Sequence, residues 1–400
     1  MVVLRTFLAG IVFVPLAALS TPATTRDNVN PYIGKNAFAN KGYAAKLEAT
    51  IDYFNAQSDK PNAARTKLVQ KIPTFSWLSY SVDVPGIKGL VADALQAQTT
   101  SSQKQVVQLV VYNLPDRDCS AKASDGEFHL IDDGLNKYKA FIDAIFAQLT
   151  TIDAKKLDFV LIIEPDALAN VITSMDFEKC RNAASAYKEG IRYAITKFQL
   201  PNVALYLDAG HGGWLGSSEE LEPTAQLFAQ VLKSAQKSSP ATQVRGLAIN
   251  VSNYNQYIAP VRENYTEGSP SWDEFHYVNS LLPRLKNAGY PTHFIVDQGR
   301  AGKAGIRTGW EEWCNLQNAG FGTRPTSDQA VLKNDYVDSI VWVKPGGESD
   351  GTSDKNSVRF DNNCVSPVAH IPAPEAGQWF NEYVVNLVKN AEPPLEPSAI

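Results

Sequence analysis

Five apolar segments of this chain show no alternation of polar and apolar residues, and each stops at or near a charged one. The clearest covers residues 159–163 and is followed by Glu164, Pro165 and Asp166. An unbroken Val/Ile/Leu run is typical of a strand buried on both faces, as in parallel sheets. The other four cover residues 106–112, 203–208, 294–297 and 339–344. Acids therefore collect at strand ends, the rim where α/β barrels carry their chemistry.

The spacing of these segments predicts seven strands that alternate with helices. We expect strands near 73–78, 106–114, 157–164, 203–208, 245–251, 293–297 and 338–344. We expect helices over 43–57, 87–97, 134–149, 176–197, 221–237, 272–288 and 375–390, after an extended arm at 21–42. The competing layout is an open doubly wound sheet. No GxGxxG or Walker loop follows a strand, and acids lie on many strand ends, so an α/β fold with a closed or nearly closed barrel is favoured.

The N-terminus has the three parts of a secretory signal. Arg5 supplies the positive charge, residues 7–19 the apolar stretch and residues 18–20 a small-residue cleavage site. We therefore expect a signal peptide at 1–20 and a secreted protein. Residues 21–400 are expected to form a single domain, because they contain no repeat, no linker and no small appended module.

Secretion changes the interpretation of the four cysteines. Cys119, Cys180, Cys314 and Cys364 lack the CxxC spacing of zinc sites. An even number in an oxidising compartment favours two disulfides. Of the three pairings, 119–180 and 314–364 are favoured because they join nearest neighbours along the chain.

Composition and motifs exclude several classes of function. The net charge of −5 and the lack of a Lys/Arg cluster argue against nucleic-acid binding. Five scattered histidines without HExxH argue against a metal site. Residues 211–214 (His-Gly-Gly-Trp) resemble the oxyanion loop of lipases, but the chain has no GxSxG nucleophile. Seven tryptophans and sixteen tyrosines suit a sugar-binding groove or simply a large core.

Two sequons could carry glycans. Asn250 ends an apolar strand and should be buried, whereas Asn264 lies in a polar loop. Asn264 is therefore the better candidate for glycosylation.

Several acids at strand ends could cleave a glycosidic bond, which needs a proton donor and a second carboxyl group. Asp166 fits the donor because desolvation at the end of an apolar strand raises a carboxyl pKa; its alternative role is a helix N-cap. Asp118 could raise the pKa of Asp166 by repulsion, or simply pair with Arg117. Asp350 lies in a glycine-rich loop, where a turn is the alternative. Asp208 is expected to bind loop amides.

Two segments of the chain resemble the signature segments of family 6 glycoside hydrolases, at residues 110–126 and 160–170. These enzymes are fungal cellobiohydrolases and bacterial or fungal endoglucanases that cut β-1,4-glucan. Further similar segments occur, in order, at residues 205–216, 250–255, 297–300 and 342–354. The resemblance implies a distorted seven-stranded parallel β/α barrel, a variant of the TIM barrel, and an inverting mechanism.

The resemblance also implies roles for single residues. Asp166 matches the general acid, Asp118 the acid that assists it, and Tyr112 the tyrosine that crowds the −1 sugar. Ser124 matches a serine that holds the attacking water, and Asp350 the candidate base. Positions matching sugar contacts, with Asp208 among them as a structural acid near the site, are Trp77, Asp208, His211, Trp214, Asn250, Trp313, Lys344 and Glu348.

The same resemblance implies that Arg117 and Arg300 pair with Asp350. Such pairing depresses the pKa of Asp350 and weakens it as a direct base, so a water relay stays open. No metal and no cofactor is implied. The expected partners are cellulose and cello-oligosaccharides, with no nucleic acid and no membrane, and the protein is expected to be a monomer.

Departures from the family pattern concern residues and modules that bind long glucan chains. Ser217 stands where many cellobiohydrolases have a second tryptophan, Ser349 stands where a cysteine is common, and no cellulose-binding module is found. Two segments, 120–133 and 349–368, have the length of loops that roof a tunnel. The sequence therefore predicts release of mainly cellobiose from non-reducing ends. An endo-acting enzyme with a more open cleft is the alternative, and a non-catalytic glycan-binding protein is a third.

Overall fold

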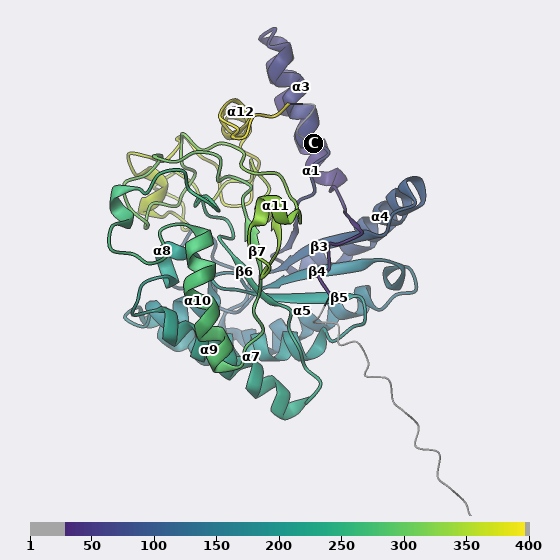
Figure 1. Ribbon diagram of the computed structural model, residues 1–400, viewed down its shortest axis with the longest axis vertical. Coiled ribbons are helices and arrows are strands. Elements are labelled where there is room, and N and C mark those ends of the chain that lie inside the picture. The colour runs from purple at the N-terminus through teal and green to yellow at the C-terminus, as the bar shows by residue number, and fades with distance from the viewer. Residues whose placement is uncertain (1–28, 397–400) are drawn as a thin grey trace, which may run out of the picture.

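The computed structural model describes residues 29–396, so the signal peptide predicted at 1–20 lies outside the described residues. A parallel sheet occupies the middle of the molecule (Figure 1). Its strand order is β1-β3-β4-β5-β6-β7-β8, and β2 pairs with β3. The strands are β1 (Asn36–Ala37), β2 (Ser76–Leu78), β3 (Gln105–Val111), β4 (Asp158–Ile163), β5 (Val203–Asp208), β6 (Gly246–Ile249), β7 (His293–Asp297) and β8 (Val337–Val341).

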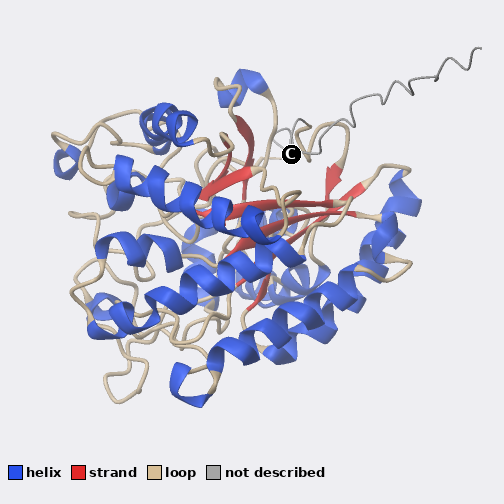
Figure 2. Ribbon diagram, turned by 90° about the horizontal axis from the view of Figure 1, so that it is seen from below, coloured by secondary structure: helices blue, strands red, loops and turns tan. Residues whose placement is uncertain are grey.

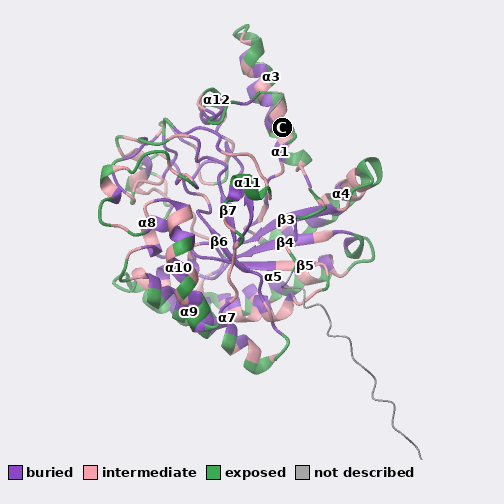
Figure 3. Ribbon diagram, in the orientation of Figure 1, coloured by how far each residue is buried: buried purple, intermediate pink, exposed green. Residues whose placement is uncertain are grey.

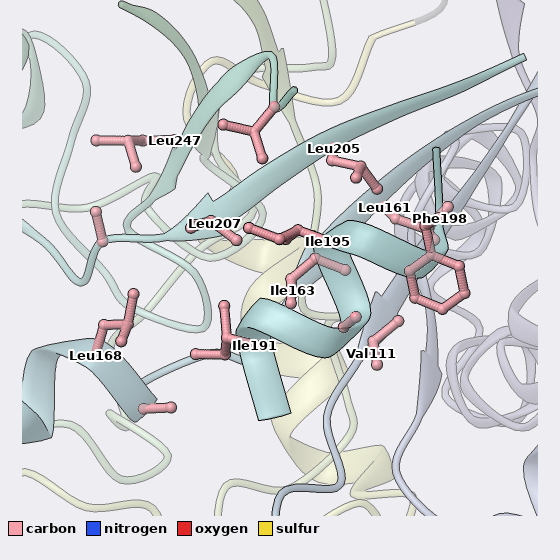
Figure 4. Packing of buried hydrophobic residues seen from close by; sticks show 14 of the residues in the cluster. Val111, Leu161, Ile163, Leu168, Ile191, Ile195, Phe198, Leu205, Leu207 and Leu247 are labelled. Carbon is pink, nitrogen blue, oxygen red and sulfur yellow. The ribbon is translucent and has the colours of Figure 1, made fainter. Parts of the chain in front are cut away.

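The central strands are buried on both faces because alternate side chains join two different cores. In β4, Leu161 and Ile163 pack among the surrounding helices, whereas Val160 and Ile162 point into the barrel interior. Figure 4 shows Ile163 beside Ile195 of α7 (Glu178–Lys197). Burying each such side chain stabilises the fold by about 1.5–3 kcal/mol. This double burial explains the unbroken apolar runs of the sequence.

Helices cover the outer face of the sheet (Figure 2) and turn their exposed sides to solvent (Figure 3). Those that follow strands β2 to β7 are α4 (Ile87–Ser101), α5 (Gly134–Leu149), α6 (Ala167–Thr173), α7, α8 (Gly212–Leu215), α9 (Leu221–Ser238), α10 (Glu274–Ala288) and α11 (Gln329–Leu332). The helices predicted at 87–97, 134–149, 176–197, 221–237 and 272–288 are confirmed, with ends that differ by a few residues, whereas the one predicted at 375–390 begins only at Asn381. The short helices α6, α8 and α11 were not predicted, since each has too few turns to show a period.

A second core lies between the N-terminal helices and the last helix. It joins α2 (Glu48–Ala56) and α3 (Lys60–Val69) to α12 (Asn381–Lys389), with α1 (Lys41–Lys46) leading into them. The helix predicted at 43–57 is divided into α1 and α2 at Leu47, whose backbone nevertheless stays in the helical region. Helix α3 was missed because it lacks a strong apolar face, and the arm at 21–42 ends in β1 and the first turn of α1.

The barrel is curled but not closed by a full ladder. Strand β8 meets the β2 side through isolated bonds, from the Phe75 N–H to the Trp342 carbonyl (3.2 Å) and from the Trp77 indole to the Val343 carbonyl (3.0 Å). The predicted α/β class and distorted barrel are confirmed. Strand β3 is shorter than predicted, because the N–H groups of Asn113 and Leu114 donate to a buried carboxylate rather than to a strand.

Both predicted disulfides are present. Cys119–Cys180 ties the loop after β3 to the start of α7, and Cys314–Cys364 ties the loop after β7 to the loop after β8. Each bridge therefore pins a loop at the carboxyl end of the sheet. That end carries the site described next.

Candidate active site

A channel with a volume of about 530 Å³ opens at the carboxyl ends of the strands. Its walls come from segments far apart in the sequence, which the parallel sheet brings to one rim. Most of the residues predicted from sequence line it: Trp77, Tyr112, Arg117, Asp118, Ser124, Asp166, His211, Trp214, Trp313, Lys344, Glu348 and Asp350. The rim that the strand-end acids predicted is therefore one continuous site.

Asp166 sits in a strained turn directly after β4. Its φ is 68°, and although it occupies the N-cap position of α6, its side chain makes no capping bond and stays available to the channel. The turn is held from behind, because the Asp166 N–H donates to Asp208 Oδ2 (2.9 Å) and Glu164 accepts from Asn113 N–H (3.0 Å). A backbone so fixed aims the Asp166 carboxyl group into the channel.

The surroundings of Asp166 favour its neutral form. Burial raises its pKa well above the ordinary value, and the nearby carboxyl groups of Asp208 and Asp118 raise it further, against the opposing effect of Lys344. Burial also raises the pKa of Asp208, to about 7. Asp166 can therefore hold a proton at mildly acidic pH, as a general acid must.

Asp118 lies in the loop that follows β3, and this loop is anchored at several points. Its Oδ2 accepts the Ser124 N–H (2.7 Å), which sets the shape of the loop. Lys179 at the start of α7 pairs with Asp125 (2.8 Å), one residue beyond Ser124. Burial raises the pKa of Asp118, while the Ser124 amide opposes that rise.

Asp350, after β8, is bound by cationic and neutral donors. Arg300 Nη1 donates to both carboxylate oxygens (2.8 and 2.7 Å), and Oδ2 also accepts from the Tyr254 hydroxyl (2.7 Å) and the Asn315 N–H (2.9 Å). Burial alone would raise the pKa of Asp350, but Arg300 and then Lys344 outweigh it and hold the pKa below its ordinary value. Asp350 is therefore charged, and its oxygens already accept several hydrogen bonds.

The predicted pairing of Arg117 with Asp350 is wrong. The Arg117 guanidinium donates to the carbonyls of Ser79 (2.6 Å) and Ser124 (2.9 Å), and closely to that of Tyr112. It also lies 4.5 Å from the centre of the Tyr112 ring. Arg117 therefore fixes Tyr112 and the loop of Asp118. Sequence spacing alone could not distinguish this role from an ion pair with Asp350. The alternative ion pair of Arg117 with Asp118 is not formed either.

Two residues predicted to contact sugar lie behind the channel instead. Asp208 is buried and accepts the N–H groups of Asp166 and Gly210 (2.9 and 3.2 Å), as a structural acid should. Asn250 is fully buried, and its Nδ2 donates to the carbonyls of Asn255 (2.8 Å) and Asp297 (2.7 Å). Both shape the loops that line the channel, and the buried Asn250 has no accessible amide for a glycan.

Aromatic side chains line the channel around the acids. The Trp77 ring meets the Tyr112 ring edge-on, with centroids 5.5 Å apart, and the ammonium of Lys344 lies 5.4 Å from the Trp77 ring centre. The Trp214 indole donates to the Thr173 hydroxyl (2.7 Å). Aromatic faces fixed in this way suit the apolar faces of pyranose rings.

Several lining residues were missed by the sequence analysis. Trp310 is the largest, and its position three residues before Trp313 was an available signal. Asn170 lies one helical turn after Asp166, so it too could have been found by spacing. Others among them are Ser79, Tyr80, Ser120, Ala121, Ser174, Asn253, Arg359 and Asn363.

The two long loops predicted to roof the channel meet each other. Ser120, Ala121 and Ser124 line it from one loop, and Arg359 and Asn363 from the other. A Cβ placed on Gly351 would lie 2.8 Å from the Cβ of Ala123, so the loops are in direct contact beside the Cys314–Cys364 bridge. Within residues 29–396, no cluster of three or more His, Cys, Asp or Glu side chains is arranged to hold a metal ion.

Comparison with known proteins identifies relatives over nearly the whole chain. The family model described as "Glycosyl hydrolases family 6" matches residues 32–391. "Exoglucanase 3" of Agaricus bisporus is 48% identical over 367 residues, which are 92% of this chain and 80% of that protein. The crystal structure of CcCel6C, a glycoside hydrolase family 6 enzyme from Coprinopsis cinerea, is 60% identical with a TM-score of 0.91, covering 92% of this chain and 100% of the other. The CcCel6A catalytic domain complexed with p-nitrophenyl β-D-cellotrioside is 46% identical with a TM-score of 0.87, covering 92% and 99%.

Proposed function

Since this chain belongs to family 6 of the glycosyl hydrolases, we propose that it hydrolyses β-1,4-glucosidic bonds of cellulose and cello-oligosaccharides with inversion, releasing mainly cellobiose from non-reducing ends. The observation that carries this proposal is the pair of acids held in different charge states in one channel. Asp166 is kept neutral, and Asp350 is kept charged. Inverting glycosidases use such a pair.

The proposed steps give each of these side chains one role. The proton of Asp166 passes to the glycosidic oxygen while the bond from that oxygen to the anomeric carbon breaks. A water molecule attacks the anomeric carbon from the opposite face and gives up a proton. The charge of Asp118 stabilises the positive charge that develops on the sugar, and Tyr112, fixed by Arg117, crowds the ring at that point.

The route of the water proton separates two versions of the mechanism. Asp350 already accepts from Arg300, Tyr254 and Asn315. These donors lower its basicity, which favours a relay through further water and the Ser124 region over direct abstraction. If azide restores turnover to Asp350→Ala, Asp350 acts as a direct base; if that variant keeps near-normal activity, the relay is supported.

The roof supports exo action. Because the loops at 120–133 and 349–368 touch through Ala123 and Gly351, a polymer enters from an end rather than from the side. An endo-acting enzyme would quickly lower the viscosity of soluble substituted cellulose while releasing little sugar. The proposed exo-enzyme should release cellobiose with a slow loss of viscosity.

Proton NMR of the first products tests the stereochemistry. The α-anomer of cellobiose should appear first and then mutarotate; an initial β-anomer would contradict inversion. The same time course on amorphous cellulose identifies the main product.

The proposal includes a secreted monomer with a glycan at Asn264. In the part of the chain that the structure describes, no helix is both long and apolar enough to cross a bilayer. Asn264 is exposed in a short 3-10 turn, and Thr266 of its sequon is buried. Mass spectrometry of the protein secreted by its host would test the cleavage site, the glycan and the single domain proposed for residues 21–400.

A further inference from the structure

A fully buried glutamate stands behind the channel, and the mechanism above does not use it. Glu274 is the first residue of α10, and its side chain is completely buried. Its Oε1 accepts two hydrogen bonds, from the Gly212 N–H (3.0 Å) and from Asn255 Nδ2 (2.7 Å). Its Oε2 is buried with no hydrogen-bond partner in the structure. Burying a carboxyl oxygen without a hydrogen-bond partner costs folding free energy, so its presence here needs an explanation.

The orientation of the Asn255 amide is fixed from its other side. Arg307 Nη2 donates closely to Asn255 Oδ1, and a guanidinium can only donate. Therefore the oxygen of the amide faces Arg307, and Nδ2 faces Glu274. The second hydrogen of Nδ2 points toward His211 Nδ1, 3.4 Å away.

His211 consequently has a fixed tautomer. Its Nδ1 also accepts the Gly213 N–H (3.2 Å), so two N–H donors face this nitrogen. A nitrogen that accepts from two donors carries no proton, so the neutral ring must be protonated at Nε2. Burial lowers the pKa of His211 to about 3, with a further contribution from Arg307, which keeps the ring neutral. His211 lines the channel between Trp214 and Trp310, each with its ring centre 6.1 Å away.

We propose that Glu274 is a positioning residue that, through Asn255 and Gly212, fixes His211 as an Nε2–H donor for a hydroxyl group of the bound glucan. This inference rests on the proposed function for its substrate, but the tautomer of His211 can be measured without any substrate. Glu274 binds the Gly212 N–H, next to His211 in the chain, and the side-chain amide of Asn255. It therefore fixes both the position of the His211 ring and the nitrogen that carries the proton.

Surrounding charges are compatible with a neutral Glu274. Burial raises its pKa to about 8, the Asn255 amide and the Gly212 N–H lower it, and Asp273 and Arg307 act in opposite directions. His211 is neutral and adds no charge. A protonated carboxyl group whose carbonyl oxygen accepts twice fits the arrangement of Oε1 and Oε2.

Nitrogen-15 NMR of histidine-labelled protein reads the tautomer directly, with His211→Gln to assign the signal. In the wild type, His211 should show the Nε2–H form from pH 5 to pH 8. In Glu274→Ala the signal should become a mixture of tautomers, and KM for cellotetraose should rise about five- to tenfold, the effect of one lost hydrogen bond. Glu274→Gln keeps an accepting oxygen and should restore both the tautomer and KM to within about twofold. Glu222→Ala, an exposed acid on α9, is the matched control and should change neither.

A second variant keeps the proposal open to refutation if Glu274→Ala fails to fold. Asn255→Asp replaces the Nδ2 donor with an acceptor, so only the Gly213 N–H still faces His211 Nδ1; the signal should again become a mixture of tautomers and KM should rise. An unchanged tautomer in a folded Glu274→Ala or Asn255→Asp protein would overturn the proposal, even if stability fell. A wild type that does not hydrolyse cellotetraose would instead refute the proposed function and leave the tautomer result standing.

Discussion

Asp166 and Asp350 face the same channel from the ends of β4 and β8, yet their surroundings differ in almost every respect. Besides burial, the carboxyl groups of Asp208 and Asp118 raise the pKa of Asp166, and Lys344 lowers it. Asp350 is met by Arg300, Tyr254 and the Asn315 amide. Both are aspartates at the rim of one sheet, so the residue type does not decide the charge.

The comparison teaches that the surrounding side chains decide which aspartate is protonated and which is charged. Burial and the acids Asp208 and Asp118 raise the pKa of Asp166, whereas Arg300 and Lys344 outweigh burial and lower the pKa of Asp350. Paired groups whose environments separate their pKa values identify the acid and the charged partner. Each side can be altered without touching the other, and the following experiments do so.

The largest effect is expected from Asp166→Asn, which removes the proton donor and leaves the shape of the side chain. Turnover of cellotetraose should fall by about 10²–10⁴, the usual contribution of a general acid. Steady-state kinetics measure the loss, and Asp153→Asn, an exposed residue paired with Lys156, serves as control. Turnover within tenfold of the wild type would mean that another group donates the proton.

On the other side, Arg300→Met leaves Asp350 buried without its cation. The free energy of unfolding should drop by about 3–5 kcal/mol, because an uncompensated charge remains in the interior. Urea unfolding measures the change. Arg192→Met breaks a partly exposed pair with Glu189 on one helix and should cost about 1 kcal/mol or less. Equal losses in the two variants would argue against a special role for the buried pair.

The two sides also predict opposite responses to pH. Burial raises the pKa of Glu164 and of Asp208 to about 7. The folded state therefore holds these protons more tightly than the unfolded state, so their stabilisation is complete below the ordinary carboxyl pKa and is lost as pH rises through about 7. Asp350, with a lowered pKa, loses its contribution only as pH falls below its ordinary range.

The free energy of unfolding should accordingly fall by at least about 2–3 kcal/mol between pH 5 and pH 8, the amount that one acid with a folded pKa near 7 gives. Urea titrations at four pH values provide the measurement. In Glu164→Gln this slope should become shallower. A wild-type stability that is flat over the interval would show that these acids ionise as freely in the folded protein as in water.

The smallest effect is expected from Tyr254→Phe, which removes one hydroxyl donor from Asp350. Stability should fall by about 1–2 kcal/mol, and the acidic limb of the pH–rate profile should move to higher pH, since the carboxylate loses part of its stabilisation. Tyr290 has a buried hydroxyl with no partner, so Tyr290→Phe is a matched control that should cost nothing. An unmoved acidic limb would separate Tyr254 from the charge of Asp350.

Features that depend on one segment at a time were predictable from the sequence. The strands were visible because both faces of β3 to β8 are buried, so their runs are mostly apolar. The disulfides followed from the number of cysteines and their order. The rim acids followed from strand ends, which a parallel sheet places together whatever the helices do.

Features that depend on contacts between distant segments could not be predicted from the sequence. Arg117 could have met either acid, and only the folded loop shows that its donors go to the carbonyls of Ser79, Tyr112 and Ser124. Asn250 was expected at the sugar, but the loop after β6 turns it inward. Glu274 lies within an ordinary amphipathic helix, and nothing in its neighbours along the chain indicates that its carboxyl group faces Gly212, 62 residues away.

The contact of Ala123 with Gly351 has a consequence for catalysis on solid substrates. Under the proposed exo action, a captured polymer would leave by sliding along its own length. Departure of the spent strand, and not bond cleavage, would then govern throughput on insoluble material. The ion pair of Lys179 with Asp125, which ties the 120–133 loop to α7, would then influence how often the strand escapes before its next cut.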